Sequence, residues 1–489
     1  MTAYTSSRPQ TRGWFATVRV ETLAWAVVAL AALLVRAIQL GSAPLDAREA
    51  AQAMAALRFA GGEALVAGDI VDPLVFGGTA LSFALFQATD AAARLVPLLG
   101  GIGLALSPLL FRHRLRRSGA LIAAAWLALS PVAVGASRRL DGTALSMLLL
   151  VVALAAADRF LLGSRRGYAL LASAALGAAL LADSGVLVAV LALALGWGFA
   201  KLTDDEDLLR PDAWRAVSAR VPWGQVAAAF AVAIAALGTL FFLAPGGLGA
   251  AADQLWRFIA GFARPVPGAL PAFVSLIVYE PGLVVFGLAG AWLATQSARP
   301  WQRALAGWGL AALILTLAYR GARPEHALWA VVPLAPLAGL ALRGLLGLRH
   351  DAPGWAAWGY PLALTGLAAM ILASLTHHLR EPRVLPFPPS VPQVSIPLDL
   401  VLIGLWVAMM LLLWMSASSL WSRRLAWRGA AAALLVITGL LAAGQSAALA
   451  FSRPASPYEP FNVGPSQPGL DRLTATAAEM GDVAVGYAY

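Results

Sequence analysis

The 489-residue chain is 60% hydrophobic and 12% charged, contains no cysteine and has a net charge of +10. Soluble domains are about 45–50% apolar and about 25% charged, so this composition excludes a soluble globular protein. The absence of cysteine excludes disulfides, thiolate nucleophiles and Cys-ligated metals. The 35 Lys and Arg residues lie mostly in short loops and at the ends of apolar runs, which indicates membrane topology and no nucleic-acid partner.

Apolar runs recur along nearly the whole chain, and a helix needs about 20 apolar residues to cross a bilayer core. We therefore expect an all-α, polytopic membrane protein. The first run ends at Arg36 and Gly41 without a small-residue cleavage pattern, which indicates an anchor and not a removed signal peptide. The runs predict thirteen spanning helices, at residues 22–40, 93–111, 119–136, 144–163, 168–182, 184–200, 224–244, 270–296, 304–319, 327–346, 356–376, 399–418 and 429–451.

The apolar stretch Leu74–Ala88 is an exception among these runs. It is short for a span and is broken by Gly77 and Gly78, which favours an interfacial or re-entrant helix at the outer membrane face. With this assignment and a cytoplasmic N-terminus, 21 of the 35 Lys and Arg residues lie inside and 14 outside. If the stretch crossed, the bias would reverse and oppose the positive-inside rule.

This topology places the longer non-membrane segments, 41–92, 247–269, 377–398 and 452–489, on the external side. The proline-rich stretch Pro382–Pro397 predicts an extended loop. We divide the chain into a transmembrane domain, 1–451, and an external tail, 452–489, which reads as helix-like at Leu470–Met480 and strand-like at Val483–Tyr489. The tail is either a short cap or the start of a larger soluble domain.

The first external segment contains Asp46 and Glu49, three residues apart at the start of an apolar-periodic stretch. This spacing is typical of a capping box, which only begins a helix. It also places both carboxylates on one helix face at the bilayer edge, where partial burial raises the pKa of a carboxyl group and suits a general base. The two interpretations are compatible. Asp69 and Asp72 follow in the same segment.

The second external turn contains Arg138, Arg139 and Asp141 between two strongly apolar helices. A guanidinium group matches phosphate bidentately, so either arginine is a candidate to bind an anionic headgroup, with Asp141 orienting it. An ordinary charged turn with Gly142 at a helix end is the structural alternative.

The region around the next long external loop contributes Trp256, Tyr279 and Glu280. Glu280 falls inside the predicted span 270–296, and a carboxylate within a span is by default a functional hypothesis. The structural alternative is that a nearby arginine, or backbone amides freed at Pro281, satisfy the carboxylate.

A fourth polar segment, with Arg320, Arg323 and His326, enters the span that follows it. It can hold an anion, although charge flanking a span is the plainer explanation. His377-His378 and Glu381 form no recognisable metal-ligand spacing. We therefore predict no metal-ligating residue.

Several segments together resemble the GT-C integral-membrane glycosyltransferases. They are Asp90–Pro97 after a short amphipathic helix, Ser137-Arg138 opening the second external turn, Val278–Pro281 before an apolar run, and Leu328–Leu334. The protein O-mannosyltransferases and the lipid A aminoarabinose transferase belong to this group, and the chain is most similar to its flippase-associated, dolichyl-phosphate-mannose-type branch. The resemblance covers roughly residues 20–350.

The resemblance implies transfer of a sugar from a polyprenyl-phosphate donor to an acceptor glycan, lipid or protein hydroxyl. The reaction would occur at the external face of a prokaryotic inner membrane. Asp46 and Glu49 would be the catalytic carboxylates and Arg138 would stabilise the departing lipid phosphate. Some relatives use a divalent cation such as Mg or Mn and others do not, and the sequence leaves this open. The residues expected to bind substrate are Arg48, Arg138, Arg139, Asp141, Trp256, Tyr279, Glu280, Arg320, Arg323 and His326.

One departure from the family pattern concerns the base. The first loop of these enzymes usually carries adjacent Asp-Glu, whereas the matching residues here are Arg48-Glu49, with Asp46 two positions earlier. Glu49 is then the remaining acid, or Asp46 substitutes through the helix turn, or the protein is an inactive relative. A scaffold or transporter for lipid-linked glycans is the alternative function.

Overall fold

The computed structural model describes residues 20–66, 68–203, 215, 218–266, 272–343, 354–380, 397–452 and 461. Helices dominate these ranges, and no β-strand occurs within them. The all-α fold expected from the apolar runs is therefore confirmed. Apart from Ser452 and Phe461 the predicted tail lies outside the described residues, and so does the proline-rich stretch up to Pro397.

Each predicted span overlaps a helix. The overlapping helices are α1 (Val20–Ala37), α5 (Leu95–Leu106), α6 (Arg112–Leu129), α8 (Thr143–Gly163), α9 (Arg166–Ala182), α10 (Val186–Leu202), α12 (Trp223–Gly238), α15 (Pro281–Thr295), α16 (Pro300–Ala318), α17 (Leu328–Arg343), α18 (Ala356–Arg380), α19 (Leu398–Leu420) and α20 (Arg423–Ala447). In the described ranges seven helices are long and apolar enough to cross a membrane, or eight with one bent pair counted as a span. The protein is an integral membrane protein, and the number thirteen stays a prediction.

The predicted span 270–296 is not one straight helix. It forms α14 (Ala272–Tyr279) and α15, which are bent by 96° relative to each other. Glu280 lies at the break and Pro281 is the first residue of α15. Proline lacks the N–H that would bond to the preceding turn, and its ring clashes with that turn, so the helix restarts there in a new direction.

Helix α17 is the centre of the core. Within Pro324–Arg343, the segment that contains α17, 83% of an apolar 18-residue stretch is buried. Trp329, Leu334 and Leu337 are almost completely enclosed by the surrounding helices. Gly290 of α15 packs directly on its backbone, because a Cβ atom there would lie 1.9 Å from the carbonyl oxygen of Leu337. Small residues allow helices in membranes to approach closely and gain van der Waals contact, which is the stabilising term that remains when lipid replaces water.

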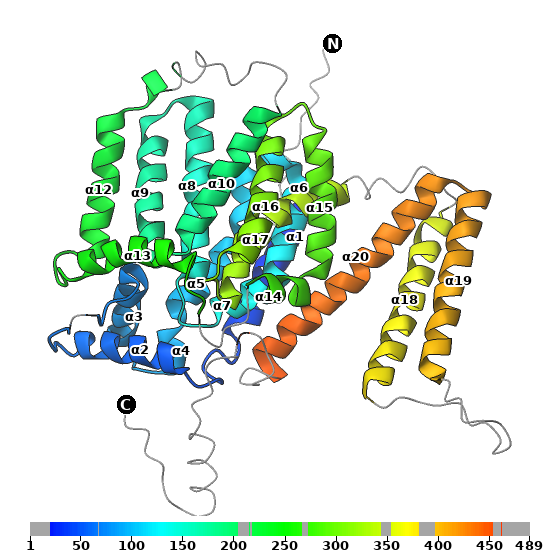
Figure 1. Ribbon diagram of the computed structural model, residues 1–489, viewed down its shortest axis with the longest axis horizontal. Coiled ribbons are helices and arrows are strands. Elements are labelled where there is room, and N and C mark those ends of the chain that lie inside the picture. Colours follow the sequence, from blue (N-terminus) through cyan, green and yellow to red (C-terminus); the bar gives the residue numbers. More distant parts are fainter. Residues whose placement is uncertain are drawn as a thin grey trace, which may run out of the picture.

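The pair α18–α19 is peripheral by comparison. It stands apart from the main bundle in Figure 1 and contacts α20. In each of the two helices, only 6% of the 18-residue apolar stretch is buried. Tyr360 packs on Gly429 of α20 and donates a hydrogen bond to the Ala426 carbonyl at 3.2 Å. The exposed apolar surface of this pair suits contact with lipid.

Short helices cover one end of the bundle. α2 (Ala47–Ala60) and α13 (Gly247–Gly261) lie across the lower end in Figure 1, roughly perpendicular to α8 and α9. The stretch Leu74–Ala88 forms α3 (Pro73–Leu85), which packs on α2 and α9. At 13 residues α3 is about 20 Å long, shorter than the roughly 30 Å hydrocarbon core. Its position at the outer membrane face remains a prediction.

Candidate functional site

The N-terminus of α2 forms the capping box that the sequence predicts. The Asp46 carboxylate accepts hydrogen bonds from the backbone N–H groups of Arg48 at 2.9 Å and Glu49 at 2.8 Å. The Glu49 carboxylate accepts the N–H of Asp46 at 3.1 Å. Asp46 also lies 3.4 Å from the guanidinium of Arg139 and keeps 43% of its side chain exposed. This residue therefore begins the helix and still reaches solvent.

Glu49 is buried and its carboxylate oxygens are already occupied. Arg94 donates to both oxygens, at 2.7 and 3.2 Å, and the backbone N–H of Leu140 donates at 2.6 Å. The Asp46 N–H is the fourth donor. Four donors hold the carboxylate in place. Glu49 thus ties the first external segment to the second external turn, and this arrangement does not favour it as a base.

Arg138 is used in a similar way. Its guanidinium donates hydrogen bonds of 2.8–3.1 Å to five backbone carbonyl oxygens. Two belong to the last turn of α1, two to the residues just after that helix, and one to Ala450. An arginine that satisfies the free carbonyls at a helix C-terminus stabilises that end of the helix. Arg138 nevertheless borders a cavity of about 210 Å³ together with Leu40, Ala43, Pro44, Leu45, Asp46, Glu49, Arg94, Gly135, Arg139, Leu449 and Phe461.

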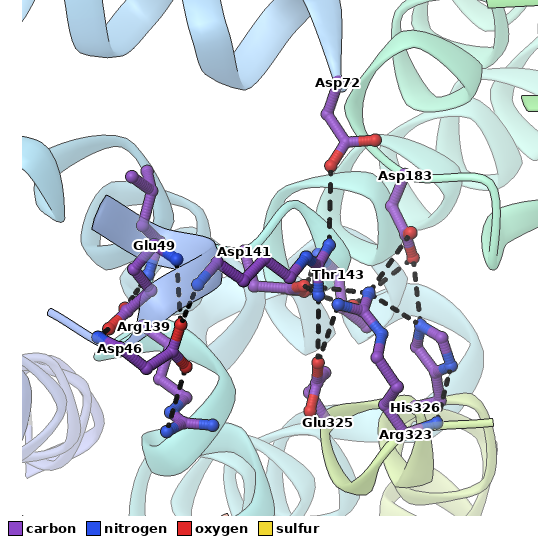
Figure 2. Close-up of polar contacts among 12 residues, drawn as sticks. Asp46, Glu49, Asp72, Arg139, Asp141, Thr143, Asp183, Arg323, Glu325 and His326 are labelled. Atoms are coloured by element: carbon purple, nitrogen blue, oxygen red, sulfur yellow. Dashed lines mark hydrogen bonds and ion pairs between the residues drawn. The ribbon is translucent and has the colours of Figure 1, made fainter. Parts of the chain in front are cut away.

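A second group of charges lies around Arg48. Figure 2 shows Asp72, Asp183, Arg323 and Glu325 of this group, set apart from Asp46 and Glu49. The Arg48 guanidinium lies 3.5 Å from the carboxylate of Asp141, 3.8 Å from Glu325 and 3.9 Å from Asp72. The Arg48 side chain is 43% exposed, whereas each of these acidic side chains is at most 6% exposed. Arg48 therefore lies between three buried carboxylates and the solvent, and a ligand can reach its guanidinium.

Arg323 is the second cation of this group. Its guanidinium lies 2.9 Å from Asp141, 3.1 Å from Glu325 and 3.9 Å from Asp183. We call Arg48, Asp72, Asp141, Asp183, Arg323 and Glu325 the charge cluster. It contains four carboxylates against two guanidinium groups. A third guanidinium, that of Arg257, lies 3.7 Å from Asp72, and negative charge is still in excess.

Neighbouring side chains hold the charge cluster in position. Thr143 donates to Asp141 through both its backbone N–H and its hydroxyl. The Nε2 atom of His326 lies 3.7 Å from Asp183, and its ring stacks on Trp329 with the ring centroids 4.5 Å apart. Gln254 of α13 donates to Asp72 at 3.3 Å. Burial on rigid elements keeps the carboxylates close together.

Burial raises the pKa of three of these carboxyl groups. It raises the pKa of Asp141 to about 7, aided by the negative charge of Glu325. It raises the pKa of Asp183 to about 7, aided by Asp72, and the pKa of Asp72 to about 6, against the opposing charge of Arg48. A carboxyl group whose pKa is near neutrality can accept a proton at physiological pH.

The remaining predicted site residues do not join the charge cluster. Glu280 is buried, and its carboxylate accepts hydrogen bonds from the Trp126 indole at 3.3 Å and from the Ser130 hydroxyl. These donors differ from the arginine or Pro281 amides that the structural alternative named. Tyr279 is buried against Phe461. The side chain of Trp256 is 61% exposed on α13. Arg320 is exposed in the turn that precedes Arg323.

The charge cluster does not fit a divalent metal ion. Within the described ranges, no group of three or more His, Asp or Glu side chains is placed to hold a metal. The guanidinium groups of Arg48 and Arg323 lie between the carboxylates, where they supply the positive charge. His377 and His378 lie 3.7 and 3.9 Å from Asp399, far along the chain from this end of the bundle.

Sequence reasoning did not assign Asp72, Asp183 and Glu325 to the site. Each lies in a turn that precedes an apolar helix, namely α3, α10 and α17. The predicted topology puts all three turns on the external side, together with Asp141 before α8. That shared side was the available signal, but it does not show that the four turns meet.

Comparison with known proteins gives likeness in structure alone. No protein-family model matches the sequence, and no curated protein matches it. ArnT from Cupriavidus metallidurans bound to undecaprenyl phosphate matches with a TM-score of 0.56 and 19% identity, over 88% of this chain and 79% of that chain. The apo state of the same protein matches with a TM-score of 0.53 and 19% identity, over 89% and 79%.

Arabinosyltransferase EmbB from Mycobacterium smegmatis matches with a TM-score of 0.51 and 17% identity, over 94% of this chain and 43% of that chain. At such identities the likeness establishes the fold. The chain therefore has the same overall fold as ArnT and EmbB.

Proposed function

We propose that the protein transfers a sugar from a polyprenyl-phosphate donor to an acceptor hydroxyl at the end of the bundle that carries the charge cluster. The main support is the convergence of four carboxylates and two arginines there, from turns before four different helices. The GT-C fold shared with ArnT bound to undecaprenyl phosphate supports the class of donor. The acceptor belongs to a glycan, a lipid or a protein, and the membrane is a prokaryotic inner membrane with this end outside.

In this proposal Arg48 and Arg323 bind the phosphate of the donor. Both guanidinium groups lie beside Asp141, so a phosphate between them would be next to the carboxylates. Arg48 is partly exposed and can turn toward a ligand, while Arg323 is held more deeply. Positive charge at the leaving oxygen stabilises the negative charge that develops there during transfer.

We assign the general base to Asp141, in place of Glu49. The acceptor oxygen attacks the anomeric carbon, and its proton passes to a carboxylate oxygen of Asp141. The bond between the anomeric carbon and the phosphate oxygen then breaks, and polyprenyl phosphate leaves. Asp141 has a raised pKa and lies beside both arginines, whereas the oxygens of Glu49 already accept four hydrogen bonds.

Asp46 is the second candidate for the base. It is half-exposed, borders the 210 Å³ cavity and lies beside Arg139. A separate candidate function is a non-catalytic GT-C relative. Arg48 favours it, because the resemblance places an acid at that position.

The test is a transfer assay on the full chain in lipid nanodiscs, with radiolabelled polyprenyl-phosphate sugars and a membrane lipid fraction as acceptor. Asp141→Asn should lower the transfer rate by about 10²–10⁴-fold, the usual range for removing a general base. Asp253→Asn, an exposed acid on α13, is the matched control and should retain the wild-type rate.

The outcomes separate the candidates. If Asp46→Asn alone abolishes transfer, the base is at the cavity and not in the charge cluster. If the wild-type protein transfers none of the donor sugars, the non-catalytic function is favoured and the proposal is wrong.

A further inference from the structure

A large apolar cavity lies at the opposite end of the bundle from the charge cluster. Its volume is about 360 Å³, within the range typical of ligand sites. It is lined by α6, the C-terminal half of α8, the middle of α10, the first half and middle of α17, the N-terminal part of α16 and the short helix η1 (Ser107–Phe111). The charge cluster adjoins the N-terminal ends of α8, α10 and α17, whereas the cavity begins about one to two turns further along these helices, at Val151, Leu193 and Val332.

The cavity wall is almost entirely aliphatic and aromatic. Val151, Leu154, Leu193 and Pro336 contribute to it, and the side chain of Leu161 is 55% exposed at its border. Water gains too few hydrogen bonds in such a space to fill it stably. An apolar occupant that enters from the membrane is the chemistry that fits.

Trp308 provides a buried polar group on this wall. Its side chain is 7% exposed, and its indole N–H donates to no acceptor among the described residues. A buried donor without a partner costs about 1–3 kcal/mol. A hydrogen-bond acceptor on the occupant would remove this cost.

The mouth of the cavity is basic. Arg114 lines it and pairs with Asp158 at 2.6 Å, and His113 lies at 2.6 Å from the same carboxylate. The adjoining Arg112 and Arg117 pair with Glu21, and Arg116 is exposed. Four arginines against two acids leave positive charge for an anionic headgroup.

We propose that this cavity binds one acyl chain of an anionic membrane phospholipid. The chain fills the apolar interior, an ester carbonyl accepts the Trp308 N–H, and the headgroup lies at the segment Arg112–Arg117. Trp301, also on the wall, is seven residues before Trp308 on α16, which places it about 10 Å nearer the end of the bundle. This spacing leaves room for the glycerol and phosphate between Trp308 and the basic mouth.

The sugar donor is a different ligand. Its phosphate belongs at the charge cluster, at the other end of the same helices. The phospholipid site therefore does not depend on the proposed transferase activity.

The first test measures lipid binding to the delipidated full chain by native mass spectrometry and by the shift in melting temperature. Phosphatidylglycerol should bind and raise the melting temperature more than phosphatidylcholine with the same acyl chains. Trp308→Phe keeps the ring but removes the N–H, and should weaken phosphatidylglycerol binding by about threefold to tenfold. Trp292→Phe, with a side chain 68% exposed on α15, is the matched control and should bind normally.

Two further variants test the chain and the headgroup separately. Ala157→Leu adds carbon atoms to the cavity wall, so it should lower lipid binding and raise the melting temperature of the lipid-free protein. Arg116→Gln should reduce the preference for phosphatidylglycerol over phosphatidylcholine.

Three results would overturn the proposal. They are equal binding of the two lipids, equal losses in Trp308→Phe and Trp292→Phe, and unchanged lipid binding in Ala157→Leu.

Discussion

Arg48 and Glu49 are neighbours on the first turn of α2, yet their surroundings differ sharply. Glu49 lies in a closed arrangement with Arg94 in which its oxygens accept four hydrogen bonds. Arg48 reaches three carboxylates at 3.5–3.9 Å, beyond direct hydrogen-bond distance, and remains partly exposed. The first arrangement is complete, and the second leaves room for a ligand.

The comparison shows that burial of charge alone does not mark a functional site. Glu49, Glu280 and Asp141 are all buried carboxylates. Glu49 and Glu280 are satisfied by nearby donors, while Asp141 shares two arginines with three other acids. Excess negative charge in a buried group costs free energy, and such a cost persists where function requires it.

The largest effect on stability is expected at the closed pair. Glu49→Ala leaves the Arg94 guanidinium buried without its carboxylate, so we expect a loss of about 3–5 kcal/mol in the free energy of unfolding. Thermal unfolding in detergent measures this loss. Glu63→Ala, at an exposed acid of the same segment, is the control and should change stability little. A small loss of unfolding free energy in Glu49→Ala would mean that the ion pair of Glu49 is no more important for stability than the contacts of Arg48.

A smaller effect, on transfer and not on folding, is expected at Arg48. Arg48→Ala should lower the transfer rate by about tenfold to a hundredfold, because one of two phosphate ligands is lost. Arg48→Lys should restore part of the rate, since the charge returns without the planar fork. The melting temperature should remain near that of the wild type. A Lys variant as inactive as Ala, with both destabilised, would assign Arg48 to structure.

The pH dependence should have opposite signs for stability and for transfer. Asp141 and Asp183 have pKa values raised to about 7, above the unfolded value of about 3.9, so the folded protein binds more protons between these values. Their contribution to stability therefore falls as pH rises from about 4 to about 7. Transfer that needs ionised Asp141 should rise through about pH 7. Melting curves and rates at pH 5–8 measure both trends, and Asp141→Asn should flatten the stability trend. An unchanged trend in this variant would contradict the assignment.

The smallest effect is expected on removing metal ions. Because Arg48 and Arg323 supply the positive charge beside the carboxylates, EDTA should change the transfer rate by less than about twofold. Added Mg²⁺ or Mn²⁺ should not shift the melting temperature. A rate that disappears with EDTA and returns with Mn²⁺ would show that a cation displaces an arginine in the working enzyme.

The amino-acid sequence determined the class of the protein and most of its helices. The length of an apolar run predicts a spanning helix, because a helix makes all its backbone hydrogen bonds within the segment and exposes its side chains to lipid. The capping box at Asp46 and Glu49 was also a local matter, fixed by a spacing of three residues. The break at Pro281 changes the direction of a predicted span, and the angle is set by packing around it.

The site depended on the tertiary structure. Asp72, Asp141, Asp183 and Glu325 are separated by tens to hundreds of residues, and nothing local brings their turns together. The sequence could indicate that Glu49 and Arg138 were charged and lay in predicted external segments, but not that Arg94 and the end of α1 already bound them. Ion pairs between distant segments form only when helix packing sets the distances between their ends. For this reason the fold, and not the motif, decided which carboxylate remains available for chemistry.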